Sequence, residues 1–169
     1  MPMMMKTNWR LLTPFIVMFG LLSSAAFAAS LPFSSFNADY IVYRAGKQHG
    51  EANRYLKLTE NGYQLGYSSD ISWMIFSDKR QETSDFIVEN GKIQPLRYTM
   101  KRSGTGPDRY YELNLDPTTK VLSEGTARKA KPVSWQDDWL DQISYQLQLA
   151  LDLKAGKTEF SYNVLNRNG

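Results

Sequence analysis

Three closely spaced aspartates, Asp137, Asp138 and Asp141, are the residues whose type and spacing could support catalysis. A pair of carboxylates can carry out glycoside hydrolysis, and a carboxylate group with further oxygen ligands can hold a cation. The same residues lie where the sequence predicts the start of a helix, and the helix dipole stabilises acidic side chains there. The structural interpretation is therefore favoured. A hydrolase of envelope glycans or lipids that uses these aspartates is the alternative.

The chain has few residues that could support other kinds of catalysis. His49 is the only histidine, so a Ser-His-Asp triad would have to use it as the base. It lies between Gly46 and Gly50 in a predicted turn, which favours a solvated loop histidine. The absence of cysteine excludes disulfides, thiolate metal sites and thiol nucleophiles. We therefore assign no catalytic residue, no metal ligand and no cofactor.

Aromatic side chains give the stronger indication of function. All ten tyrosines lie after residue 28. Tyrosine is common on ordinary sheet faces, but aromatic rings that line a curved sheet can also bind an apolar or glycan-like ligand. The residues predicted to bind a ligand are Tyr40, Tyr67, Trp73, Tyr98 and Trp139.

Alternation of apolar and polar residues predicts a mainly β fold, of the α+β class, built on a meandering antiparallel sheet that is curved or barrel-like. The predicted strands cover about 36–43, 50–59, 63–67 and beyond, 80–88, 92–102, 110–115 and 120–124. Asn61-Gly62 and Asn90-Gly91 predict tight hairpin turns, and Pro95 predicts an edge or a bulge. The apolar run Trp73-Met74-Ile75-Phe76 is expected to be a buried strand end or a crossing between strands.

One helix is predicted near residues 135–154. Its apolar stripe consists of Leu140, Ile143, Leu147, Ala150 and Leu151. Ser134 and Asp137 resemble a capping box at its start, and strand alternation resumes over 158–164. Because Asn168-Gly169 begins a turn that no strand follows, we expect the C-terminal strands of the domain to be missing.

The first 28 residues predict a cleaved export signal. Lys6 and Arg10 precede an apolar stretch at 11–22, and Ala26-Phe27-Ala28 is an A-x-A cleavage pattern. Cleavage would leave a linker at 29–35 and a single β-rich domain at 36–169, truncated at its C-terminus. The alternative is an uncleaved anchor in the inner membrane. Against it, the apolar stretch has about half of the ~20 residues that a spanning helix needs.

Removal of the signal changes the charge balance. Two of the 20 Lys and Arg residues lie in it and none of the 17 Asp and Glu residues does, so the net charge falls from +3 to about +1. This balance gives no indication of a nucleic-acid partner. An export signal without cysteine predicts a soluble periplasmic protein rather than a lipoprotein, with no stable transmembrane segment in the mature chain.

Several segments resemble a bacterial family of exported proteins. They are Phe36-Asn37-Ala38-Asp39-Tyr40, Gly50-Glu51-Ala52, Glu89-Asn90-Gly91-Lys92-Ile93-Gln94-Pro95 and Asp141-Gln142-Ile143-Ser144-Tyr145-Gln146-Leu147. They are similar to the family known as domain of unknown function 3108, and the resemblance covers most of residues 33–169. It implies a periplasmic, mainly antiparallel β protein with a barrel-like sheet. It implies no catalytic residue.

These observations favour a non-catalytic binding or envelope-assembly protein. An aromatic-rich concave sheet face would bury an apolar ligand, a lipid or a segment of a partner. The expected partners are accordingly a lipid, a glycan or an envelope protein. Besides the hydrolase, a scaffold that recruits a partner strand at an open sheet edge is the other alternative.

Overall fold

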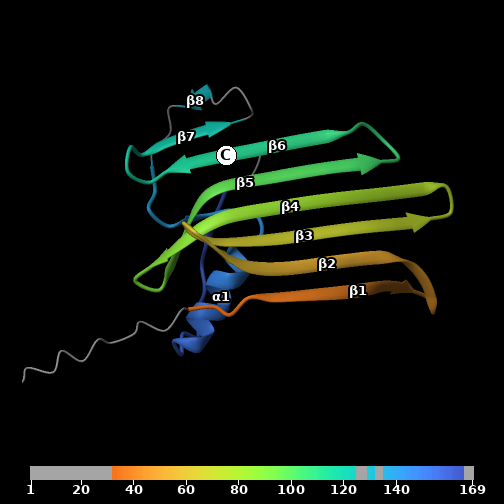
Figure 1. Ribbon diagram of the computed structural model, residues 1–169, viewed down its shortest axis with the longest axis horizontal. Coiled ribbons are helices and arrows are strands. Elements are labelled where there is room, and N and C mark those ends of the chain that lie inside the picture. Colours follow the sequence, from red (N-terminus) through yellow and green to blue (C-terminus); the bar gives the residue numbers. More distant parts are fainter. Residues whose placement is uncertain (1–31, 125–128, 132–134, 166–169) are drawn as a thin grey trace, which may run out of the picture. The chain divides into compact units, whose positions relative to one another are not determined.

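The computed structural model describes residues 32–124, 129–131 and 135–165 (Figure 1). The predicted export signal, Ser134 and the final Asn168-Gly169 pair lie outside these residues. The described part of the chain folds into an eight-stranded antiparallel sheet with one helix, which confirms the predicted mainly β class.

The sheet is a meander in which every strand pairs with its neighbours in sequence. Its strands are β1 (Phe36–Arg44), β2 (Lys47–Thr59), β3 (Gly62–Trp73), β4 (Phe76–Glu89), β5 (Lys92–Gly104), β6 (Arg109–Asp116), β7 (Val121–Glu124) and β8 (Lys129–Lys131). Helix α1 covers Tyr145–Lys154, and the short strands β9 (Trp139–Leu140) and β10 (Asn163–Val164) pair in parallel. Since β1 and β8 are the two ends of the strand order, the sheet is open and does not close into a barrel.

Local sequence explains the tight turns and the one irregularity of the long strands. Ala45-Gly46 and Asn90-Gly91 adopt left-handed conformations, with φ between 50° and 75°, as two-residue hairpin loops require. The bulge predicted at Pro95 is confirmed, because the β4–β5 register shifts between Asp85 and Phe86. Phe86 therefore pairs with Pro95, so Pro95 rather than Leu96 shares a face with Tyr98.

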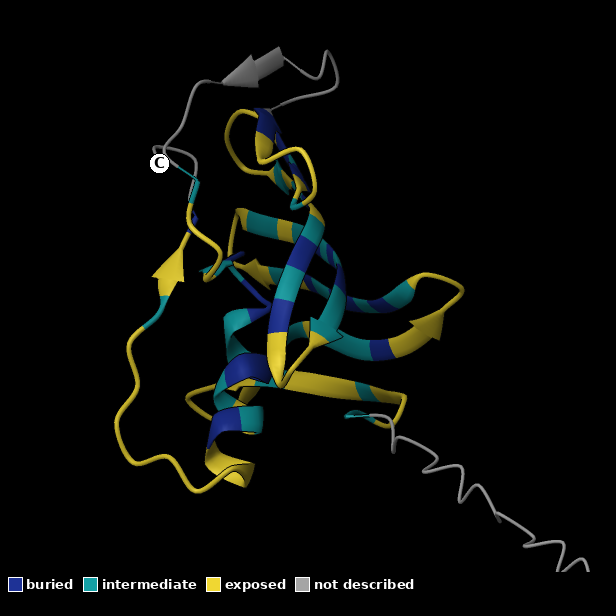
Figure 2. Ribbon diagram, turned by 90° about the vertical axis from the view of Figure 1, so that its left-hand side faces the viewer, coloured by how far each residue is buried: buried dark blue, intermediate teal, exposed yellow. Residues whose placement is uncertain are grey.

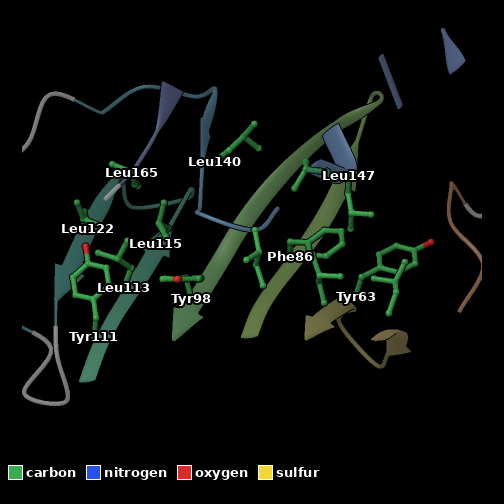
Figure 3. Close-up of a cluster of buried hydrophobic side chains, with 14 residues drawn as sticks. Tyr63, Phe86, Tyr98, Tyr111, Leu113, Leu115, Leu122, Leu140, Leu147 and Leu165 are labelled. Carbon is green, nitrogen blue, oxygen red and sulfur yellow. The ribbon is translucent and has the colours of Figure 1, made fainter. Parts of the chain in front are cut away.

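One side of the sheet, here called the inner face, carries most of the buried side chains and contacts α1. Directly paired residues of antiparallel strands share a face, and the central row of the inner face runs Leu56, Leu65, Ser84, Tyr98 and Leu113. The hydrophobic core comprises Leu56, Tyr63, Leu65, Phe86, Ile93, Tyr98, Tyr111, Leu113, Leu115, Leu122, Leu140, Ile143, Leu147 and Leu165 (Figure 3). Buried residues gather where α1 lies against the strands, whereas the hairpin ends are exposed (Figure 2).

The helix is shorter than the apolar stripe predicts, and the prediction that it begins near 135 is wrong. It begins at Tyr145, because Leu140 lies in the parallel pair with β10 and Asp141 forms a turn. The Asp141 carboxylate accepts hydrogen bonds from the backbone N–H groups of Ile143 and Ser144. The predicted strand at 158–164 is correspondingly reduced to two residues.

The expectation that residues 73–76 are buried is also wrong. Trp73 pairs with Phe76, so the run forms a hairpin turn between β3 and β4. Met74 and Ile75 at its apex are 82% and 84% exposed. This turn lies at the end of the sheet away from α1, with the β1–β2 and β5–β6 turns (Figure 1).

A candidate ligand pocket on the inner face

A pocket of about 540 Å³ lies between the inner face and the segment that leads into α1. Its lining residues are Tyr40, Ala52, Arg54, Leu65, Tyr67, Arg80, Glu82, Gln142, Ile143 and Gln146. Strands β1 to β4 supply the sheet side, and residues 142–146 supply the opposite side. The volume is within the range typical of small-molecule sites. We call this hollow the inner pocket.

Strand register brings the sheet residues of the pocket together. Tyr67 pairs with Arg54 on one side and with Glu82 on the other, which places the three in one row. Tyr40 lies in the next row, opposite Ala52. Rows two residues apart project to the same face, so both rows line the inner pocket.

A buried polar cluster forms the floor of the pocket. Glu82 is 4% exposed, and its carboxylate accepts a hydrogen bond from the Tyr98 hydroxyl. The Nε atom of Arg80 lies 2.6 Å from the other Glu82 carboxylate oxygen. Burial, together with the hydrogen bond to Glu82, raises the pKa of Tyr98 far above its usual value of 10.0. Tyr98 therefore remains a donor, and Glu82 is held by two partners.

Asp141 fixes the segment that covers the pocket. It is fully buried, and the Ser84 hydroxyl of β4 donates a hydrogen bond of 2.5 Å to its carboxylate. Burial raises the pKa of Asp141, although the hydrogen bonds from Ser84 and from the backbone act in the opposite direction. The Tyr98 hydroxyl also lies 3.4 Å from Gln142 Oε1. These contacts hold residues 141–144 against β4 and β5.

The lining carries more positive than negative charge. It includes two guanidinium groups, Arg54 and Arg80, and one carboxylate, Glu82. Arg80 compensates Glu82, whereas no acidic side chain in the described part of the chain forms an ion pair with Arg54. A guanidinium group is well suited to bind a phosphate or a carboxylate through paired hydrogen bonds. The inner pocket can therefore accommodate an anionic group.

The five residues predicted to bind a ligand do not form one site. Tyr40 and Tyr67 line the inner pocket, and Tyr98 lies buried beneath it. Trp73 lies at the exposed β3–β4 turn, half-buried under the guanidinium of Arg44. Trp139 pairs with Trp135, their ring centroids 5.4 Å apart, and lines a separate hollow of about 580 Å³.

The charged residues of the pocket were missed at the sequence level. Arg54 and Glu82 occupy strand positions whose alternation assigns them to the same face as Leu56 and Ser84. A charge at a position assigned to the buried face of a strand is unusual. That mismatch was the signal that could have found them.

The three aspartates considered for catalysis have separate partners. Asp137 contacts Lys120 and accepts a 2.8 Å hydrogen bond from Trp135 Nε1, and both contacts lower its pKa. Asp138 accepts a hydrogen bond from Asn163. Asp141 is buried against Ser84, and none of the three lines the inner pocket.

Metal ligation and His49 give no further site in the described residues. No group of three or more His, Asp or Glu side chains there could hold a metal ion. His49 lies in β2 rather than in the predicted turn, with its Nδ1 atom 3.1 Å from the carbonyl oxygen of Ser72. None of the helices formed by these residues is long and apolar enough to span a membrane.

Comparison with known proteins assigns the chain to a group without a described activity. Residues 36–169 match the family described as "Protein of unknown function (DUF3108)". No curated protein and no solved structure matches the chain.

Proposed function

We propose that this chain, which belongs to the DUF3108 family of proteins of unknown function, is an exported, non-catalytic binding protein of the bacterial envelope. Its ligand would be a small envelope component that combines an anionic group with hydroxyl-rich or apolar parts, as in an anionic lipid or glycan. The inner pocket is the proposed binding site. The export pattern of residues 1–28 supports the location.

The single observation that carries the proposal is the guanidinium of Arg54, which pairs with no acidic side chain among the described residues and lies beside two tyrosine rings. Arg54 supplies a charge that can bind a phosphate or carboxylate. Tyr40 and Tyr67 supply amphipathic rings that can pack against a sugar or an acyl chain. The amides of Gln142 and Gln146 add donors and acceptors for hydroxyl groups.

The composition of the pocket supports binding rather than hydrolysis. Hydrolysis of a glycosidic bond uses two carboxylates, and Glu82 is the one carboxylate of the lining. Tyr98 and Arg80 both engage Glu82, so its oxygens are directed to the protein. Asp137, Asp138 and Asp141 lie outside the lining, which makes the hydrolase alternative the less supported one.

Native mass spectrometry of the mature protein purified from periplasm tests this proposal. The wild-type protein should carry an anionic small molecule. Arg54→Gln should weaken its retention about tenfold or more, the loss expected for one charge-assisted hydrogen bond. Lys101→Gln removes an exposed cation from the other face and serves as the matched control. A wild-type protein without a bound molecule, or equal retention by Arg54→Gln, would refute the proposal.

The exposed edge of β1 favours a second candidate function, the recruitment of a partner strand. Among the described strands, β1 is the first of the order and pairs with a neighbour along one edge only, and its residues Ile41 and Tyr43 are 55% and 61% exposed. An uncovered edge of this length can add a strand from another protein. A photo-crosslinking residue at Tyr43 should then give a discrete adduct in cells, and a proline at Ile41 or Val42 should abolish it. The absence of an adduct would count against strand recruitment.

A further inference from the structure

The β3–β4 turn contradicts the local preferences that the β4–β5 hairpin of this chain follows. Met74 adopts a left-handed conformation with φ 55°. Asparagine and glycine are favoured at such positions, and Asn90, with φ 52°, fills the corresponding first position of the two-residue loop between β4 and β5. Neither strand propensity nor solubility favours Met74-Ile75 at an exposed apex. Departures from local rules of this kind are expected at functional positions.

Four consecutive apolar side chains form this apex, which we call the hairpin tip (Trp73–Phe76). Met74 and Ile75 are almost fully exposed, and Trp73 and Phe76 are about half exposed. The rings of Trp73 and Phe76 stack with centroids 6.4 Å apart. The tip is therefore a narrow apolar projection, not a groove or a broad patch.

A neighbouring loop braces the backbone of the tip. The Thr105 hydroxyl lies 3.4 Å from the carbonyl oxygen of Ile75 and accepts a 2.9 Å hydrogen bond from Ser77 N–H. Thr105 N–H in turn donates to the carbonyl of Ser77. Satisfied backbone groups are the condition for placing a turn in an apolar medium.

The turns at the same end of the sheet as the hairpin tip carry more positive than negative charge. The three turn segments at this end of the sheet, residues 44–47, 73–76 and 104–109, contain Arg44, Lys47 and Arg109 but only one acidic residue, Asp108. The Arg44 guanidinium lies over the Trp73 ring, 4.9 Å from its centroid. Nearby acidic side chains are engaged elsewhere, since Asp78 pairs with Arg102 and Asp70 with Lys79.

We propose that the hairpin tip inserts into the surface of an anionic lipid bilayer. Met74 and Ile75 would enter the apolar layer, and Trp73 with Arg44 would lie at the level of the headgroups, where tryptophan and basic residues are favoured. The cations of these turns complement anionic headgroups. A protein partner is less suited, because a specific interface buries about 800 Å² on each side and four side chains at a convex tip offer far less.

Vesicle flotation of the mature protein tests the proposal. Wild-type protein should float with vesicles that contain phosphatidylglycerol and much less with phosphatidylcholine alone, and added salt should weaken the binding. The double variant Met74→Asn, Ile75→Gly should bind about tenfold more weakly or worse. This variant installs the turn sequence already used at residues 90–91, so its fold should be retained. Leu153→Gln removes an exposed apolar side chain of α1 and is the matched control.

Two further measurements distinguish insertion of the tip from binding through the inner pocket or to a second copy of the chain. Trp fluorescence should shift to the blue on vesicle binding in the wild type but not in Trp73→Phe. Arg54→Gln should leave vesicle binding unchanged, since Arg54 lines the inner pocket and not the tip. Unchanged flotation of the double tip variant would overturn the proposal. A second result would also overturn it: the wild-type protein does not bind vesicles but self-associates in sedimentation, and the double tip variant does not self-associate. The tip would then contact a second copy of the chain.

Discussion

Asp141 shows how one side chain can determine the position of a whole segment. Its carboxylate accepts hydrogen bonds from the Ser84 hydroxyl of β4 and from the N–H groups of Ile143 and Ser144. The Ser144 hydroxyl accepts a hydrogen bond from the Asp141 N–H in return. The segment that covers the inner pocket is thus attached to the sheet through a fully buried acid.

Removal of this side chain should destabilise the fold. Asp141→Ala leaves the Ser84 hydroxyl and two backbone N–H groups buried without their partner, and we expect the free energy of unfolding to fall by about 1–3 kcal/mol. Asp141→Asn retains an acceptor and should lose less. Urea denaturation followed by circular dichroism measures both, and equal stability of the alanine variant and the wild type would contradict this role.

The pH dependence of the same pair of proteins tests the raised pKa of Asp141. Above its ordinary pKa of 3.8 the unfolded chain releases this proton while the folded protein retains it. The folded state then binds more protons, so this group lowers wild-type stability as pH rises from about 4 toward the folded pKa. Asp141→Asn lacks this contribution, and its stability relative to the wild type should increase with pH over that window. Parallel stability curves would show that the pKa is not raised.

At the residue scale, the inner pocket includes two of the aromatic residues singled out from the sequence, Tyr40 and Tyr67, and charged residues that were not singled out. Alternation assigns Tyr40 and Tyr67 each to one face of its own strand, and the register of β1, β2 and β3 then places both on the inner face. Arg54 and Glu82 share that face, but their function depends on the distant segment 142–146 that makes a pocket of it. Tyr98 was predicted to bind a ligand, but it is fully buried in the core and its hydroxyl donates a hydrogen bond to Glu82.

At the element scale, the ring of Tyr55 on β2 packs directly over Gly66, its partner on β3. A Cβ atom added at Gly66 would lie 2.1 Å from Cε1 of Tyr55. Tyr55 and Gly66 are paired directly, on the face of the sheet opposite the inner face. The Tyr55 hydroxyl donates a hydrogen bond to Gln64, and Gln64 donates to Asp85. The ring therefore connects three strands on the side of the sheet away from α1.

A double-mutant cycle should reveal this contact. Gly66→Ala displaces the Tyr55 ring and should destabilise the protein by roughly 1–3 kcal/mol. Tyr55→Ala should remove most of the penalty of the second substitution, so that the two changes are not additive. Chemical denaturation of the four proteins gives the coupling. Additive effects would mean that the ring does not rest on Gly66.

Elements set by local sequence were predicted well, and elements set by distant contacts were not. The hairpins around residues 60 and 90 follow from turn chemistry within a few residues. The start of α1 was misplaced because β9 pairs with β10, which lies more than twenty residues later in sequence. Residues 73–76 were predicted to be buried, because an apolar run usually indicates burial, but they form an exposed turn.

At the scale of the whole molecule, the central strands of the sheet have buried side chains and two neighbouring strands, whereas the edge strand β1 is largely exposed. β4 has neighbours on both sides and buried residues such as Glu82, Ser84 and Phe86. β1 has one neighbour and no buried residue. Contacts of the inner face with α1 are made chiefly through β5, where Gln148 Oε1 accepts a hydrogen bond from Ile93 N–H.

Amide hydrogen exchange should follow this difference in cover. Because local opening is easiest where few side chains are buried, peptides from 36–44 should exchange at least about tenfold faster than peptides from 76–89. Exchange measured by mass spectrometry on the folded protein tests the order. Similar rates for the two segments would indicate that β1 is covered by contacts outside the described residues.

The meandering strand order bears on how the chain reaches its folded state. Each strand of the sheet meets its partner after closing a turn, an event of low contact order that proceeds quickly. By contrast, the Gln148–Ile93 and Asp141–Ser84 hydrogen bonds join residues 55 and 57 positions apart. The hairpins can therefore form while the inner face is still uncovered. The inner pocket would then be completed last, when residues 141–154 dock onto a sheet that is already paired.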